Sequence, residues 1–212
     1  MAEVKQGILG GVSGKVGTVV GASWRGKNII RARPRKTGKK ASKKQLDHRS
    51  KFSLVSQFLQ PLNFLLKRYF GTSQGLKSPL NLAMAYHINE AVVAQEDAFV
   101  IQVEKVVISK GILPTVTMNT VTVDHATLSL AWTINTAASL GKASDLLTVV
   151  VYDKQSHVIQ IFDRVVTRGA AAFSTSLPEG IEAGSCVIWF FLTNEEDTEC
   201  STSSFVKASG GN

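Results

Sequence analysis

The sequence predicts an α+β protein: a glycine-rich N-terminal β segment with a basic arm, a short helical region, and a C-terminal immunoglobulin-like β-sandwich. Glycines separate β-forming residues over the first 26 positions, and apolar residues then recur at three- and four-residue steps. From residue 99 onward, short apolar and alternating segments are separated by turn signals. With 44% hydrophobic residues among 212, the chain has enough apolar material for a real core. We therefore expect two parts, residues 1–98 and residues 99–212.

The N-terminal segment holds seven of the 17 glycines, and we expect short strands and turns there, with Trp24 as an anchor. Glycine permits positive φ or a close approach of two backbones. Such a segment has little core of its own, so it should pack on another element or another subunit. The candidate assembly contacts are Gly10, Gly11, Gly14, Gly17, Gly21 and Trp24.

The net charge of +8 is unevenly distributed. Residues 1–51 hold 14 Lys or Arg against two acids, whereas residues 52–212 hold ten against 14. Such a density of positive charge is self-repulsive unless an anionic partner neutralises it, so we expect contact with a nucleic-acid backbone or an acidic protein surface. A solvated arm that keeps the protein soluble is the alternative. The candidate anion contacts are Arg25, Lys27, Arg31, Arg33, Arg35, Lys36, Lys39, Lys40, Lys43 and Lys44.

Two helical patterns follow the basic arm. The first begins near Ser42, and Pro61 should kink it or restart it because proline is tolerated in the first turn of a helix. Ser78 and Pro79 are a good N-cap and first residue for a second helix, which should run to about Gln95. We expect the aromatic residues of this region, Phe52 and Phe64 among them, to lie in the core.

Seven or eight short strands are expected after residue 98, one of them with Trp132 in its middle, and this pattern is typical of an immunoglobulin-like sandwich. The predicted strands are Phe99–Ser109, Thr115–Val121, Thr127–Ile134, Leu146–Tyr152, His157–Phe162, Ala171–Ser176, Cys186–Thr193 and Ser203–Lys207. Cys186 and Cys200 lie too near one end of the region for the usual inter-sheet disulfide, so we expect both to be reduced.

Motifs for catalysis and cofactor binding are weak. The segment Gly10–Val16 fails the phosphate-loop pattern, because Leu9 and Val16 stand where glycine and Ser or Thr are needed. The four histidines lack the spacing of metal ligands. The acidic run Glu195–Asp197 should be a solvated loop, with calcium binding or pairing with the basic arm of a neighbouring copy as alternatives. We expect no enzyme activity, no cofactor and no metal.

The N-terminal half resembles an uncharacterised family, a domain of unknown function widespread in Bacteroidetes and their phages. The resemblance lies in Gln6–Gly11, in Gly14–Gly26 and in Arg31–Pro34. The family continues with Asn-Pro-x-Thr-x-x-Gln-x-x-x-Arg. Here Ser42, Gln45 and Arg49 match the last three positions, while Lys39 and Lys40 stand where Asn-Pro would be. The resemblance implies phage and prophage structural modules, and it implies no activity and no catalytic residues.

Two functional hypotheses follow. The first is a non-enzymatic structural or assembly protein, a phage-related decoration, connector or minor capsid component that contacts itself or other particle proteins. The second is a host protein that binds nucleic acid without reading its sequence. An enzyme of unrecognised type and a cell-surface adhesion module are the remaining alternatives. We expect synthesis in the cytoplasm, since the first residues do not form a signal peptide, and no membrane span.

Overall fold

The structure is a computed structural model that describes residues 3–4, 11–24, 27–34, 38, 40–96, 98–124, 126–134, 140–178, 180–181 and 183–210. Contacts between residues divide the chain into two units, Met1–Ser42 and Lys43–Asn212. This division differs from the expected boundary at residue 98. The helices after Ser42 share one hydrophobic core with the C-terminal strands, so they belong to the second unit.

The first unit contains a four-stranded antiparallel sheet, which we call the N-terminal sheet, in the order β1-β2-β3-β4. Its strands are β1 (Glu3–Val4), β2 (Val12–Val16), β3 (Val19–Trp24) and β4 (Lys27–Ala32). A two-residue turn joins β2 to β3, and Gly17 in this turn has a φ of 55°, which favours glycine. A Cβ on Gly21 would collide with the backbone of Val12. The start of β2 therefore crosses closely over β3, which only glycine at position 21 allows.

The second unit, which we call the body, begins with a layer of helices. These are α1 (Lys43–Leu59), the 3₁₀-helix η2 (Gln60–Leu62), α2 (Asn63–Tyr69), α3 (Pro79–Tyr86) and the π-helix η3 (His87–Ala91). Pro61 lies in the first turn of η2, and the Ser78 hydroxyl caps α3 by accepting from the backbone N–H of Asn81 at 3.3 Å. The second helix was expected to run to about Gln95 and is shorter. Helical structure ends at Ala91, because the next four residues pair with β6.

The remaining strands of the body form a small hairpin and two four-stranded sheets. The hairpin is β5 (Val92–Gln95) with β6 (Ala98–Ile101). The first sheet has the order β10-β9-β12-β13 and the second the order β11-β8-β7-β14. All their strand pairs are antiparallel except β14 with β7. Their strands are β7 (Thr117–Asp124), β8 (Thr127–Thr133), β9 (Leu146–Asp153), β10 (Ile159–Thr167), β11 (Ala172–Ser176), β12 (Cys186–Thr193), β13 (Ser204–Lys207) and β14 (Ser209–Gly210).

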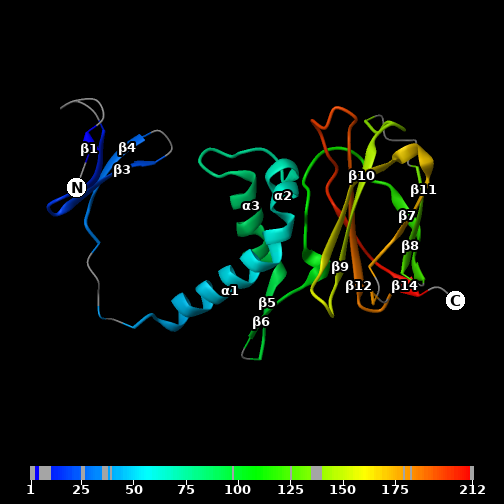
Figure 1. Cartoon of the computed structure of the whole chain (residues 1–212), viewed down its shortest axis with the longest axis horizontal. Helices are drawn as coiled ribbons and strands as arrows, with labels where there is room; N and C mark the ends of the chain where they lie inside the picture. The colour runs from blue at the N-terminus through cyan, green and yellow to red at the C-terminus, as the bar shows by residue number, and fades with distance from the viewer. Residues whose placement is uncertain are drawn as a thin grey trace. The chain divides into compact units, whose positions relative to one another are not determined.

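The body has three layers, with the β9 and β12 strands in the middle (Figure 1). One core lies between the two sheets and includes Leu130 and Trp132 of β8 opposite Ile188 of β12. The other lies between the first sheet and the helices, where Trp189 of β12 packs with Leu59 of α1. Successive residues of a strand point to opposite faces, so β12, which is buried along its whole length, supplies side chains to both cores.

The expected strand Phe99–Ser109 is wrong beyond Ile101. Val103–Lys105 forms the 3₁₀-helix η4, and the buried residues that follow hydrogen-bond to side chains rather than to a neighbouring strand. The backbone N–H of Val107 donates to Nε2 of His87, and that of Ile108 donates to the Ser203 hydroxyl. Within the described part of the chain, no helix is long and apolar enough to cross a membrane.

Candidate functional site

One face of the N-terminal sheet, which we call the cationic face, carries Lys15, Lys27 and Arg31. Paired residues of antiparallel strands share a face, and side chains alternate along each strand. Val20 pairs with both Lys15 and Arg31, so these two cations lie on either side of it. Lys27 is four residues from Arg31 on β4 and therefore shares its face. All three cations are exposed, so the face presents positive charge from two strands.

Arg33 and Trp24 extend the cationic face at its two ends. The backbone N–H of Arg33 donates to the Thr18 carbonyl oxygen at 2.8 Å, so the pairing of β3 and β4 continues one step past Ala32. Arg33 therefore continues the row of Arg31. Trp24 pairs with Lys27 and is 48% exposed. The face thus joins four cations with an accessible indole.

The opposite face, which we call the neutral face, presents apolar side chains. Val16 pairs with Val19, and Val19 pairs with Ala32, so these three form a row across the strands. Ile30 lies beside this row on β4 and is 69% exposed. In the described strands β2, β3 and β4, no charged side chain lies on this face. Four exposed apolar residues, Val16, Val19, Ile30 and Ala32, form what we call the neutral patch.

The glycines predicted as assembly contacts shape the N-terminal sheet. Gly17 makes the β2–β3 turn, and Gly21 is buried beneath Val12. A Cβ on Gly11 would meet the Asn28 side chain, and Gly14 has a φ of 108°. Because Gly21 is buried, it acts through the shape of the sheet and not through direct contact with a partner. Gly10 lies outside the described residues.

The remaining predicted anion contacts lie near the start of α1 or outside the described residues. Lys40, Lys43 and Lys44 are exposed, and the first turn of α1 has no acidic residue. Cations at this end oppose the helix dipole, so an anion there would relieve an unfavourable interaction. Arg25, Arg35, Lys36 and Lys39 lie outside the described residues.

The acidic loop after β12 contacts the body's own cations. The Asp197 carboxylate forms an ion pair with Arg68 of α2 and lies 3.5 Å from the Arg164 guanidinium. It also accepts a hydrogen bond from the Tyr69 hydroxyl at 2.8 Å, and burial raises the pKa of Tyr69. Asp197 therefore joins the loop to α2 and β10. The described residues contain no group of three or more His, Cys, Asp or Glu arranged to hold a metal ion.

The charged pair Arg168 and Asp145 lies inside the body. The Arg168 guanidinium is 2.9 Å from the Asp145 carboxylate, and both side chains are 1% exposed. The guanidinium also donates to the Pro114 carbonyl oxygen at 2.7 Å, while the Arg168 carbonyl accepts from the Trp132 indole at 2.9 Å. Sequence analysis missed this pair. Its burial makes it a structural element that fixes the loop before β9 and the chain after β10.

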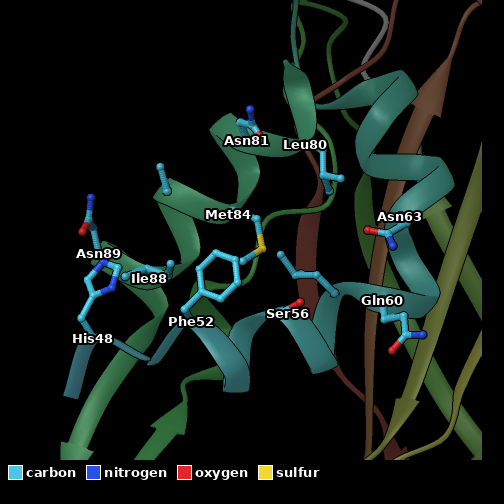
Figure 2. A pocket seen from close by; sticks show the side chains of 12 residues that line it. His48, Phe52, Ser56, Gln60, Asn63, Leu80, Asn81, Met84, Ile88 and Asn89 are labelled. Carbon is cyan, nitrogen blue, oxygen red and sulfur yellow. The ribbon is translucent and has the colours of Figure 1, made fainter. Parts of the chain in front are cut away.

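A groove of about 750 Å³ lies between α1 and α3. Phe52, Leu80 and Met84 supply apolar lining, and Asn63, Asn81 and Asn89 supply amides (Figure 2). The expectation that Phe52 lies in the core is wrong, because half of its surface is exposed at this groove; Phe64 is exposed as well. His48 is the one titratable residue among the described lining residues. An imidazole without a nearby carboxylate or thiol gives this groove no acid–base or nucleophilic pair.

The two cysteines are free and buried, as expected from their positions. Burial raises the pKa of both the Cys186 and the Cys200 thiols to about 11. Because the thiolate is the reactive form, neither residue is a nucleophile near neutral pH.

Comparison with known proteins gives one family. A family of unknown function, DUF6266, matches residues 11–207. The match begins before β2 and ends with β13, so it includes strands of the N-terminal sheet together with the helices and both sheets of the body. No curated protein matches the sequence.

Proposed function

The chain belongs to the DUF6266 family, a family of unknown function, and from this premise we propose that it is a non-enzymatic structural or assembly protein. In this proposal it is a component of a phage or phage-like particle, in a decoration, connector or minor capsid role. The N-terminal sheet is the part that contacts other subunits, and the body is the part that they hold in place.

The observation that carries this proposal is a sheet without a core of its own. Both buried apolar clusters of the described residues lie entirely after Ser42. In the N-terminal sheet, by contrast, Gly21 is the one buried residue among residues 11–24 and 27–34, while Ile30 is 69% exposed. A small sheet needs a covered apolar face for stability. A partner that covers this sheet would supply the missing burial.

The strand order of the body supports an immunoglobulin-like or fibronectin-like sandwich as its architecture. In chain order, the strands β7, β8 and β11 lie in one sheet and β9, β10, β12 and β13 in the other. This is the division of strands A, B and E from strands C, C′, F and G in such sandwiches. Sandwich domains of this kind serve as rigid platforms whose edges and loops meet partners. A helical layer on one sheet is the addition in this chain.

Light scattering of the purified, nuclease-treated protein at low and high salt tests the proposed assembly. We expect the full chain to form a defined oligomer that is resistant to salt and free of nucleic acid. A chain beginning at Lys43 should be a monomer, since it lacks the whole N-terminal sheet but keeps both cores. Removal of residues 1–26 alone is a weaker test, because it leaves β4 without its partner β3. A full chain that is monomeric under every condition would contradict the proposal.

The second candidate function is binding of nucleic acid without sequence preference. The cationic face favours it, because Lys15, Lys27 and Arg31 point the same way and Trp24 lies beside them. Cations track a phosphate backbone, and an exposed aromatic ring stacks on bases of any identity. In this function the protein would act in the host cell, and nucleic acid would take the place of protein partners.

A further inference from the structure

The proposed assembly requires a particular surface, and the inference that follows rests on that function. We propose that the neutral patch, Val16, Val19, Ile30 and Ala32, packs against the same patch of a second copy of this chain. The two N-terminal sheets would then meet face to face around a two-fold axis, with their cationic faces turned outward.

Charge identifies a second copy as the occupant. The first 51 residues carry 14 cations against two acids, so two copies of this segment repel each other wherever their cations face. The cationic face, with Lys15, Lys27 and Arg31, excludes such a contact between copies. The neutral face has no charged side chain in its described strands, so it can approach its own copy without bringing cation to cation.

The shape of the neutral patch also suits self-packing. Val16, Val19 and Ala32 form a straight row across three strands, and Ile30 projects beside it. Two sheets that pack face to face interdigitate such side chains at a separation of about 10 Å. A two-fold axis needs only one patch that is complementary to itself. The crossing of β2 over Gly21 covers the rest of this face and leaves the patch as its open part.

The size of the patch predicts a reversible contact. Four small side chains bury much less than the roughly 800 Å² per partner of a standard interface. We therefore expect association in the micromolar range, which a particle strengthens by holding many copies together. The oligomer mass should accordingly rise with protein concentration.

Two neighbouring isoleucines on β4 supply a matched test in the full chain. Ile30 lies in the neutral patch, and Ile29 lies on the opposite face, where it pairs with Ala22. Ile30→Asp should weaken self-association at least tenfold in sedimentation velocity over a concentration series. Ile29→Asp adds the same charge to the same strand and should leave association within about twofold of the original protein. Equal losses in both variants would overturn the proposal.

A cross-linking experiment keeps the test valid if aspartate disturbs the sheet. Ala32→Cys places a thiol in the neutral patch, and Arg31→Cys places one on the cationic face. The native cysteines are buried with raised pKa values, so they do not compete at neutral pH. A bis-maleimide should link Ala32→Cys into dimers and leave Arg31→Cys as monomer. The reverse pattern would overturn the proposal.

The outcomes separate this inference from the proposed function. If the chain beginning at Lys43 is monomeric while Ile30→Asp still forms the full oligomer, the N-terminal sheet assembles through another surface and only the inference fails. If the full chain never associates, both fail. If the full chain sheds nucleic acid together with its oligomeric state, the cations and not the neutral patch hold the copies together, and the inference fails.

Discussion

His87 shows how one residue of the body responds to pH. Its side chain is buried against Phe70 and Tyr86, with Nδ1 donating to the Ala83 carbonyl oxygen at 2.8 Å. Nε2 accepts from the backbone N–H of Val107 at 3.3 Å. Both ring nitrogens are therefore used by the neutral form, which fixes one tautomer. Burial lowers the pKa of His87 and nearby Lys110 lowers it further, while the hydrogen bond to Ala83 opposes them.

The lowered pKa of His87 predicts a loss of stability in mild acid. An unfolded histidine titrates near 6.5, so the unfolded chain takes up the proton before the folded chain as the pH falls. The stability from neutral His87 is complete above pH 6.5 and decreases below it, with a limiting slope of about 1.4 kcal/mol per pH unit. Urea unfolding between pH 7.5 and 5 measures it. His87→Gln, which keeps a donor and an acceptor, should flatten this slope, whereas His48→Gln at an exposed position should not. A slope unchanged in His87→Gln would contradict the assignment.

The helical layer shows how an element depends on its seat against a sheet. Helix α1 carries cations along its first half, while Val55 and Leu59 in its second half are buried against the β9–β12 side of the body. Leu46 on the same helix is 52% exposed. The apolar residues of α1 thus divide between core and surface, and packing of the second half holds the helix in place.

Two leucines of α1 test this packing. Leu59→Ala removes a 1% exposed side chain and leaves a cavity, so we expect a loss of about 2–5 kcal/mol in the free energy of unfolding. Leu46→Ala makes the same chemical change at the surface and should alter it by no more than about 0.5 kcal/mol. Denaturant unfolding of both variants at one pH gives the comparison. Similar losses at the two positions would mean that α1 is not seated on the sheet.

At the scale of the whole molecule, charge and fold divide at nearly the same point. The structural division follows Ser42, and the excess of cations ends by Lys51. The body from residue 52 has more acids than cations, and Asp197 and Asp145 are engaged by its own arginines. The cations of the first unit are therefore the part of the chain available to an anionic partner.

Salt dependence distinguishes the second candidate function from the first. If the cationic face binds a phosphate backbone, affinity for double-stranded DNA should fall steeply with salt, and each lost phosphate contact should reduce the logarithmic slope by about 0.9. The Lys27→Gln/Arg31→Gln double variant should show a slope smaller by about two in fluorescence anisotropy. Lys105→Gln/Lys154→Gln, at exposed positions of the body, is the control and should keep the slope. A slope that is the same in both variants would exclude the cationic face from DNA binding.

Local patterns determined much of the secondary structure. Strand β12 has the predicted bounds, because a continuous apolar segment between turn signals marks a buried strand. Strands β8, β9, β11 and β13 agree with their predicted bounds to within one residue. The Ser78 cap and the helical restart at Pro61 were also predictable, since capping and proline effects act within a few residues.

Only the tertiary structure decided which surfaces these elements share. The sequence by itself determined the segments, the excess of cations before residue 52 and the glycine-rich strands. It did not show that the helices cover one face of the β9–β12 sheet, that Arg168 meets Asp145, or that Lys15 shares a face with Arg31. Each of these depends on contacts between residues distant along the chain or on the pairing register of the strands. A shift of one residue in that register would move every cation of β4 to the other face. The separation of a cationic face from a neutral patch is therefore a property of the folded sheet.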